Sequence, residues 1–323
     1  MTSILLLSEP DLVAIGLTLD ETLALVEHAY ALQDAGKADV PAKVGVHPSH
    51  PNSFLHAMPA WLGGERPAVG MKWVSYYPGN ADRGQPDSTG IIVLNDPDTG
   101  LPLCMMEGMY ITFLRTAACA AAAARRLARE PKRLGLVGCG GLGKWSLRFM
   151  RHVFPSLEAV YVSSRRPESR EAFCAATHAS SCSVMPVGDP REAVVDSDIV
   201  VTSVPPTDSP PVKAGMLGDD MLFIPLDVVN SWSPDAMQDF DCFVADSTEA
   251  LAQRMARKLG RDMPAAKPML ATQSLITRDA RPAKARGRMF VGVCGIASID
   301  IAMAWAMYER ATSLGLGTRY RVR

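Results

Sequence analysis

The chain has 323 residues, 48% of them hydrophobic and 21% charged, a composition that is typical of globular proteins and excludes a disordered chain. Its length allows two hydrophobic cores, since single cores stop growing near ~250–300 residues. The 33 basic and 34 acidic residues leave a net charge of -1, so no overall charge favours nucleic acid or an anionic membrane as a partner.

Cysteine usage and the N-terminus predict a cytoplasmic protein. The seven cysteines are spread along the chain without CxxC spacing, which argues against a disulfide scaffold and a zinc ribbon, and we predict no metal site. The first residues lack the basic region of a signal peptide. The longest apolar run, residues 117–124, is an alanine-rich segment too short to span a membrane.

The first part of the chain predicts a strand, a helix and a meander of antiparallel strands. Residues 3–7 are a short apolar run, and a helix is expected to begin after Thr18, where Glu21 completes a capping box. Between residues 40 and 106, short apolar runs alternate with Pro, Gly and Asp turns, which is the pattern of an antiparallel meander. An alanine-rich helix over residues 112–129 follows and is expected to end before a proline.

From residue 132 the pattern changes to strands that alternate with helices. Apolar runs such as RLGLVG, AVYVSS and DIVVTSV are separated by helical segments, which predicts a parallel sheet with crossover helices. Residues 248–288 are predicted as mixed helix and polar loop, and their basic end, residues 278–288, as a solvated loop. An amphipathic helix over residues 297–317 is expected near the C-terminus.

The clearest motif is LGLVGCGGLG, in which three glycines have G-x-G-x-x-G spacing. It follows an apolar strand and opens a helix, the context in which glycines let the backbone approach a pyrophosphate and the helix N-terminus offers N–H groups to it. A glycine-rich turn without a ligand is the alternative interpretation. The residues that we assign to the cofactor site are Gly138, Gly140, Gly141, Leu142 and Gly143 of this turn, together with Thr116, Ser203 and Val204.

The tip of the following strand predicts which dinucleotide binds. An NAD site usually has a carboxylate there, which accepts a hydrogen bond from the ribose 2′-OH. This chain has Ser164, Arg165 and Arg166 instead, and a hydroxyl beside two guanidinium groups suits a 2′-phosphate. We therefore predict NADP(H) as the preferred cofactor and NAD(H) as the alternative. In the competing interpretation the two arginines only solvate a loop.

Several segments occur in a characteristic order: VPAKVGV (40–46), MPAW (58–61), GMKWVSYYPGN (70–80), GIIVLNDPDTGLPL (90–103), TFLRTAACAAAAARRLA (112–128), GCGGLG (138–143) and GIASIDIAMAW (295–305). With these segments the chain resembles the ornithine cyclodeaminase/mu-crystallin family. That family includes ornithine and lysine cyclodeaminases, amino-acid dehydrogenases, cyclic-imine reductases and mu-crystallin. Two departures count against ornithine cyclodeaminase activity: Lys43 stands where the family usually has arginine, and VSYYPGN differs from the cyclodeaminase segment.

The resemblance implies an α/β fold with two domains. A Rossmann dinucleotide-binding domain would occupy residues 118–300. A split α+β domain, made of residues 1–117 and 301–323, would bind the substrate and pair two subunits into a homodimer. The predicted meander and the last helix, which flank the alternating segment, agree with this division.

The resemblance also implies roles for charged residues. Lys72 and Arg115 would hold the carboxylate of the substrate, with Lys43 as a third cation. Lys72 and Asp227 would be catalytic, and Asp227 would handle the substrate amine or its proton. Without the resemblance, the alternative is that each cation is a surface charge and that Asp227 caps a turn.

Two further titratable residues receive no catalytic role. His56 is interpreted as a core or sheet-edge histidine. Asp300 is interpreted as a helix-start or interdomain hydrogen-bonding residue rather than a catalyst.

Together these features predict an NAD(P)H-dependent oxidoreductase that transfers a hydride at the α-carbon of a small amino, imino or keto acid. Amino-acid dehydrogenases and ketimine reductases are of this type. A cyclodeaminase of the ornithine or lysine type, which is an ammonia lyase with catalytic NAD, is the alternative. A second alternative is an NADPH-dependent small-molecule binding protein with little turnover. The expected partners are the small acid and a second copy of the chain.

Overall fold

The computed structural model describes residues 3–178, 182–262, 267–282 and 287–322. It divides into unit 1, residues 1–115 with 296–323, and unit 2, residues 116–295. These boundaries differ by a few residues from those predicted at 117 and 300. The first lies inside helix α3 (Met109–Leu127), which begins in unit 1 and ends in unit 2. The second precedes helix α9 (Ala297–Leu314), which belongs entirely to unit 1.

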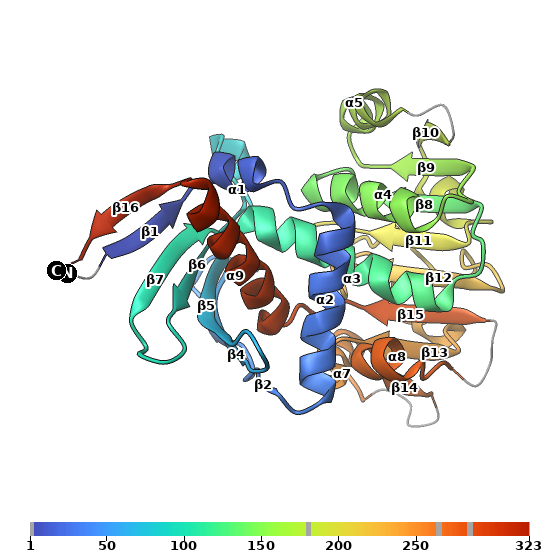
Figure 1. Ribbon diagram of the computed structural model, residues 1–323. Coiled ribbons are helices and arrows are strands. Elements are labelled where there is room, and N and C mark those ends of the chain that lie inside the picture. The colour runs from blue at the N-terminus through green and yellow to red at the C-terminus, as the bar shows by residue number, and fades with distance from the viewer. Residues whose placement is uncertain (1–2, 179–181, 263–266, 283–286, 323) are drawn as a thin grey trace. The chain divides into compact units, whose positions relative to one another are not determined.

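Unit 1 contains a mixed sheet made of β1 (Ser3–Leu7), β2 (Ala38–Asp39), β3 (Val44–Val46), β4 (Phe54–Leu62), β5 (Ala68–Tyr76), β6 (Ser88–Asn95), β7 (Pro102–Glu107) and β16 (Thr318–Arg321). The strand order is β16-β1-β7-β6-β5-β4-β2, and β3 also pairs with β4 (Figure 1). Strand β1 is parallel to β7, whereas β4, β5, β6 and β7 pair antiparallel in sequence order. The predicted meander is therefore confirmed.

Helix α9 packs against β4, β5 and β6, and also against the helices α1 (Glu9–Ile15) and α2 (Leu19–Asp34). All residues from Ala297 to Ala304 are buried. The prediction of an amphipathic helix was therefore wrong for this segment, because both the sheet and other helices cover it. A short 3-10 helix, η1 (Ala81–Arg83), lies between β5 and β6.

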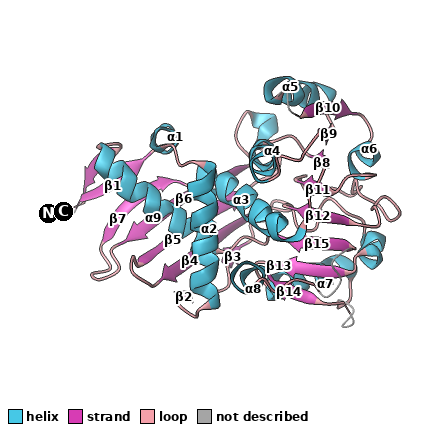
Figure 2. Ribbon diagram, turned by 45° about the vertical axis from the view of Figure 1, so that its right-hand side comes forward, coloured by secondary structure: helices cyan, strands magenta, loops and turns pink. Residues whose placement is uncertain are grey.

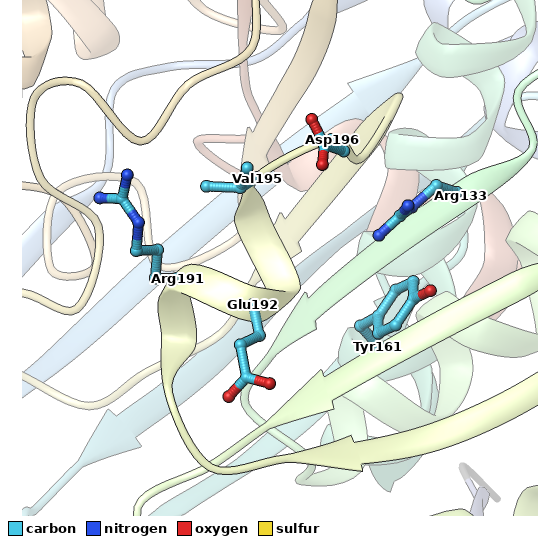
Figure 3. Close-up of a pocket in the computed structure, with 6 residues that line it drawn as sticks. All are labelled: Arg133, Tyr161, Arg191, Glu192, Val195 and Asp196. Carbon is cyan, nitrogen blue, oxygen red and sulfur yellow. The ribbon is translucent and has the colours of Figure 1, made fainter.

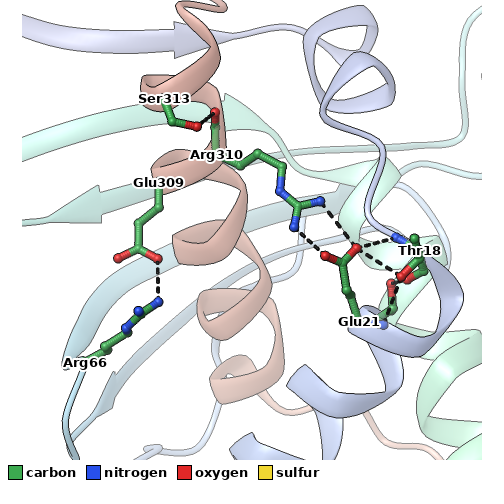
Figure 4. Close-up of polar contacts among 7 residues, drawn as sticks. Thr18, Glu21, Arg66, Glu309, Arg310 and Ser313 are labelled. Atoms are coloured by element: carbon green, nitrogen blue, oxygen red, sulfur yellow. Dashed lines mark hydrogen bonds and ion pairs between the residues drawn. The ribbon is translucent and has the colours of Figure 1, made fainter.

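Polar contacts attach α9 to α2 and to the sheet (Figure 4). The Thr18 hydroxyl accepts a hydrogen bond from the backbone N–H of Glu21 at 3.2 Å, and the Glu21 carboxylate accepts one from the Thr18 N–H at 2.8 Å, which confirms the predicted capping box. Arg310 of α9 donates to the same carboxylate, and this bond is the main reason that the pKa of Glu21 falls to about 2. Arg66 and Glu309 form a second, more exposed pair at 3.6 Å.

Unit 2 contains a parallel sheet made of β8 (Arg133–Val137), β9 (Ala159–Ser163), β10 (Ser183–Val187), β11 (Ile199–Thr202), β12 (Met221–Pro225), β13 (Cys242–Ala245), β14 (Met269–Ala271) and β15 (Arg288–Gly292). Its order is β10-β9-β8-β11-β12-β15-β13-β14, and each of these pairs is parallel. The first five positions have the strand order of a Rossmann fold. The predicted α/β class is confirmed.

The helices of unit 2 lie on both faces of this sheet, with α4 and α6 on opposite sides (Figure 2). Phe223, Phe243 and Phe290 from neighbouring strands pack together in the core beside α7. Besides the second part of α3, the helices are α4 (Gly141–Val153), α5 (Pro167–Thr177), α6 (Pro190–Val194), α7 (Thr248–Leu259), α8 (Thr272–Arg278) and the 3-10 helix η2 (Pro234–Asp239).

Some elements were not predicted. Strands β2, β14 and β16 are short, and β16 is exposed along its whole length, so its sequence shows no alternation of buried and exposed residues. Of the basic segment 278–288, residues 283–286 lie outside the described residues. The seven cysteines are all described, and none of them forms a disulfide. No helix in the described ranges combines the length and the apolar sequence needed to cross a membrane.

Candidate active site

Lys72 lies on strand β5, between β4 and β6. Successive side chains of a strand point to opposite faces of the sheet, and Lys72 lies on the buried face. The residues paired with it across the sheet are Met58 of β4 and Ile92 of β6, and both are buried. Cross-strand partners share a face of the sheet, so Lys72 occupies an inward position in an apolar row. Its side chain is 1% exposed. A lysine at such a position needs partners, because burial of an unpaired charge is costly.

Asp300 of α9 supplies the charged partner of Lys72 and binds Arg115 of α3 as well. The Lys72 Nζ donates to Asp300 Oδ1 at 2.7 Å, and the Arg115 Nε donates to the same oxygen at 3.0 Å. Lys72 also donates to the Thr112 hydroxyl at 3.3 Å. Asp300 is 0% exposed, and its Oδ2 has no hydrogen-bond partner among the described residues. We call Lys72, Arg115 and Asp300 the Lys72 cluster.

The charges in the Lys72 cluster shift its pKa values strongly. Burial, and then the positive charge of Arg115, lower the pKa of Lys72 to about 7, although Asp300 opposes this effect. Lys43 adds a smaller effect in the same direction as burial. Burial alone would raise the pKa of Asp300, but the charges of Arg115 and Lys72 outweigh it and lower that pKa. With Lys72 protonated the cluster carries a net charge of +1, which suits a single carboxylate.

The other residues predicted near this site lie on the strands β3 and β4. Lys43 directly precedes β3 and is half-buried. His56 of β4 stacks on Phe54, with ring centroids 4.2 Å apart, and meets His47 edge-on at 5.9 Å. These ring contacts agree with the interpretation of His56 as a sheet residue.

The glycine motif of unit 2 forms the turn between β8 and α4. Gly138 has a φ of +110°, and a Cβ there would lie 2.3 Å from the carbonyl oxygen of Ser203. A Cβ on Gly143 would lie 2.5 Å from the Gly138 carbonyl oxygen. Beside Gly140, in contrast, a Cβ would meet nothing within 4 Å. The turn is thus tight within the protein but open at the N-terminus of α4, where its backbone N–H groups begin the helix.

The tip of β9 carries the residues that predict the cofactor. The Ser164 hydroxyl donates to the carbonyl oxygen of Arg166 at 3.0 Å, and Arg170 donates to the Ser164 carbonyl at 3.1 Å. Arg165 and Arg166 are exposed. The loop therefore presents guanidinium groups to solvent next to the turn that follows β8, as a site for a phosphate requires.

Asp227 follows β12 and accepts hydrogen bonds at both of its carboxylate oxygens. Oδ2 accepts from the Thr202 hydroxyl and the Val204 N–H, both at 3.0 Å. Oδ1 accepts from the Asn230 N–H at 3.1 Å and from the N–H and hydroxyl of Ser231 at 3.1 and 3.0 Å. Burial raises the pKa of Asp227 despite these bonds. The carboxylate thus fixes the position of Val204, one of the predicted cofactor residues.

The backbone beside Asp227 is strained. Val228 has a φ of +60°, a conformation that costs a β-branched residue about 1–3 kcal/mol. The Val228 N–H donates to the Pro225 carbonyl at 3.0 Å, and that of Val229 donates to the Asp227 carbonyl at 2.7 Å. The bonds accepted by Asp227 therefore help to hold a turn that would otherwise relax. Thr116, the remaining predicted cofactor residue, is buried at the start of unit 2 in α3.

A separate hollow of unit 2, with a volume of ≈ 370 Å³, lies beside α6 (Figure 3). Arg133, which begins β8, lies over the ring of Tyr161 there at 4.6 Å. The hollow therefore lies toward the start of β8, whereas the glycine turn follows its end. Its lining residues are Arg133, Tyr161, Arg191, Glu192, Val195 and Asp196. None of them is a predicted site residue.

Comparison with known proteins decides the family. The profile of the ornithine cyclodeaminase/mu-crystallin family matches residues 6–229, which cover unit 1 up to Arg115 and the glycine turn of unit 2. The chain belongs to this family. The resemblance inferred from the sequence segments is therefore confirmed.

Several known proteins match the chain over nearly its whole length. The nodulation efficiency protein NfeD of Rhizobium meliloti is 30% identical over 97% of both chains. A structure of Thermococcus litoralis Δ1-pyrroline-2-carboxylate reductase in complex with NADH and L-proline is 26% identical, has a TM-score of 0.87 and covers 98% of this chain and 99% of that one. An archaeal alanine dehydrogenase dimer with bound NAD is also 26% identical, with a TM-score of 0.88 and complete coverage of both chains.

The sequence predicted Lys72 and Arg115 as site residues, but it did not predict that Asp300 joins them. Asp300 was set aside as a helix-start residue, and it lies 228 residues from Lys72 and 185 from Arg115. A signal was present in the sequence, since Asp300 is the one charged residue in the apolar segment ASIDIAMAWAM. A single charge in a buried helix usually has a buried partner.

Proposed function

We propose that this protein is an NAD(P)H-dependent oxidoreductase that transfers a hydride at the α-carbon of a small amino, imino or keto acid. The observation that carries the proposal is the buried, net-positive Lys72 cluster in a chain that also has an open dinucleotide turn. The names of two relatives support it, since one reduces Δ1-pyrroline-2-carboxylate and binds NADH and the other is an alanine dehydrogenase with NAD.

On the substrate side, the Lys72 cluster binds the carboxylate. Arg115 and Lys72 supply the positive charge, and Lys43 increases it. Both head groups are fixed by the same oxygen of Asp300, so they lose little freedom when the substrate binds. Lys72, with a pKa of about 7, can hold a proton or release it to the α-nitrogen or α-oxygen of the substrate near neutral pH.

On the cofactor side, the turn from Gly138 to Gly143 and the N-terminus of α4 bind the pyrophosphate. Ser164, Arg165 and Arg166 receive the adenosine ribose, and we propose that they favour the 2′-phosphate of NADP(H) over NAD(H). Asp227 keeps the loop of Ser203 and Val204 in place. The bound dinucleotide supplies the hydride. The protein supplies position and charge.

We also propose a cytoplasmic homodimer. On the outer face of the unit 1 sheet, Val44, Trp73 and Ile91 lie in one cross-strand row with Ala57, and Trp61 shares the face of Ala57. Val44 is 69% exposed, Trp61 42% and Ile91 40%. Apolar side chains on a shared face favour burial against another surface, and the archaeal alanine dehydrogenase is described as a dimer. Light scattering tests this proposal, and a monomer at micromolar concentration would refute it.

The function is tested with a panel of amino acids and of keto acids with ammonium, each with NADPH, NADP⁺, NADH and NAD⁺. Net absorbance change near ~340 nm reports dinucleotide redox chemistry, and ammonia is measured in parallel. We expect net, stoichiometric oxidation or reduction with an acid of the panel. Ammonia release without net redox change would instead identify a cyclodeaminase, and cofactor binding without turnover would identify a binding protein.

A further inference from the structure

Asp300 differs from the other residues of the Lys72 cluster because it opposes the charge that a substrate carboxylate needs. A carboxylate in a receptor for carboxylates weakens the binding of an anion, unless it provides something that the two cations cannot provide alone. The structure suggests what this is, since one oxygen, Oδ1, binds both cation heads at 2.7 and 3.0 Å.

The surroundings of Lys72 explain the need for this carboxylate. The strands on either side of β5 bring the apolar residues Met58 and Ile92 to the lysine, and α3 brings the neutral Thr112 and the positive Arg115. The segment before β3 adds the positive charge of Lys43. Among the largest effects on the pKa of Lys72 from the described residues, the negative charge is that of Asp300 of α9. Without it, burial and two cations would all favour the neutral amine.

We propose that Asp300 is a positioning residue, whose buried carboxylate holds Lys72 and Arg115 side by side and keeps Lys72 charged, so that the pair binds one carboxylate of the substrate. This inference rests on the proposed function for the identity of the ligand. The role of Asp300 toward Lys72 is a property of unit 1 alone, and it can be measured without turnover.

The Oδ2 of Asp300, which accepts no hydrogen bond from the described residues, agrees with this role. A carboxylate that served only the stability of the fold would gain from donors at both oxygens, as Asp227 does. In Asp300 one oxygen takes both cations and the other has no partner among the described residues. The geometry of Asp300 thus orients Lys72 and Arg115, although it leaves part of the hydrogen-bonding capacity of Asp300 unused.

The test compares Asp300→Asn with Thr112→Val, because the two replaced residues are the charged and the neutral partner of the same ammonium group. Asparagine keeps the size of Asp300 but removes its charge. Loss of an opposite charge at this distance is expected to lower the pKa of Lys72 by about 1–3 units. Thr112→Val removes the hydroxyl that accepts from Lys72 and donates to the Gly108 carbonyl, but it leaves all charges, so we expect no comparable shift.

The first measurement is urea unfolding of the wild type and both variants between pH 5.5 and 8.5, which requires no substrate. Asp300 stays ionised in this range in the folded protein, because its pKa is lowered, so the change with pH reports Lys72. As the pH rises, Lys72 loses its proton also in the wild type, and the two proteins become more alike. The folding equilibrium constant of Asp300→Asn should therefore recover by about tenfold or more relative to the wild type. A difference that is independent of pH would overturn the proposal.

The second measurement is the pH profile of kcat/KM for the acid that the panel identifies. We expect KM of Asp300→Asn to rise about tenfold or more at pH 8 and to approach the wild-type value as the pH falls, with an unchanged Kd for the dinucleotide. A loss of activity that is equal at every pH would mean a structural role only and would overturn the proposal. If the wild type turns over no acid, the proposed function fails, and the unfolding data still decide the role of Asp300.

A second variant covers the case in which Asp300→Asn does not fold. Lys72→Met combined with Asp300→Asn removes the excess buried cation. We expect this double variant to fold at pH 6 better than Asp300→Asn alone, because its stability no longer depends on a charged lysine. A double variant that is no more stable than the single one would contradict the proposal.

Discussion

Asp300 in unit 1 is fully buried and Asp227 in unit 2 is half-buried, and their pKa values shift in opposite directions. Asp300 faces two cations, whose charges lower its pKa. Asp227 faces hydroxyl and backbone N–H donors, and burial raises its pKa even though both oxygens are hydrogen-bonded. The comparison shows that two charged neighbours together outweigh the effect of burial on the pKa of Asp300, whereas the neutral donors at Asp227 do not.

The difference also separates two roles. The Lys72 cluster keeps a net positive charge in a buried place, which is useful only if an anion neutralises it. Among the described residues, the Asp227 carboxylate accepts hydrogen bonds only from hydroxyl and backbone N–H donors, while Lys258 acts on it through charge and donates to the Val229 carbonyl. These contacts hold a strained turn next to Val204. The Lys72 cluster of unit 1 is thus suited to bind an anion, whereas Asp227 of unit 2 stabilises the conformation of a turn.

The largest effect is expected when Lys72, the titrating member of the Lys72 cluster, is replaced. In Lys72→Met we expect kcat/KM for the acid substrate to fall about 10²–10⁴-fold, the usual range for loss of a general acid or base. Stability at pH 6 should not fall, because burial of an ammonium group is itself costly. The exposed pair of Lys132 and Glu158 provides the control, since Lys132→Met should leave kcat/KM unchanged.

Arg115→Ala removes the other cation of the Lys72 cluster. We expect KM for the acid to rise by about 30-fold or more, because truncation of one partner of a buried charge pair costs about 2–5 kcal/mol. The Kd of the dinucleotide should not change, and neither value should change in Arg125→Ala, which alters an exposed arginine of the same helix. If Arg115→Ala instead loses NADPH binding and keeps its affinity for the acid, the assignment of Arg115 to substrate binding is wrong.

The arginines at the tip of β9 should discriminate between cofactors. In the double variant Arg165→Ala, Arg166→Ala, NADPH affinity should fall by about tenfold while NADH affinity stays the same, since only NADPH carries the 2′-phosphate. Calorimetry with both dinucleotides measures this, with Arg191→Ala of α6 as the control. If the wild type binds NADH as tightly as NADPH, Arg165 and Arg166 do not recognise the 2′-phosphate and are only solvent-exposed residues of the loop.

Asp227→Asn tests the second half of the comparison. An asparagine has one acceptor oxygen instead of two, so part of the network is lost and the unfolding free energy should fall by about 1–3 kcal/mol. We expect a severalfold weaker NADPH affinity through Val204 and an unchanged KM for the acid. The sequence-based prediction that Asp227 handles a proton requires a different result: kcat would fall about 10²–10⁴-fold with unchanged NADPH affinity.

The parts of the fold that depend on local sequence could be predicted. The alternation of strands and helices after residue 132 and the meander before it are regular patterns over many residues, and the structure confirms both. Strand β16 could not be predicted because its pairing with β1 is formed across the full length of the chain. Helix α9 is not amphipathic as predicted, since its first eight residues are all buried.

The candidate site was predictable only in part, for a similar reason. The glycine turn is a contiguous motif, and Lys72 and Arg115 lie in segments that carry the family resemblance. Asp300 is joined to them by two hydrogen bonds that span 228 and 185 residues. Its role follows only from the packing of α9 on β5, which no local pattern specifies.

The most direct test of the account compares the best acid of the panel with its primary amide in the wild-type enzyme. The amide has nearly the same shape but no negative charge, so it leaves the buried Lys72 cluster without a counter-charge. We predict that kcat/KM for the amide is lower by about 100-fold or more, mostly through KM. An amide that is turned over as efficiently as the acid would contradict the claim that the Lys72 cluster binds the substrate carboxylate.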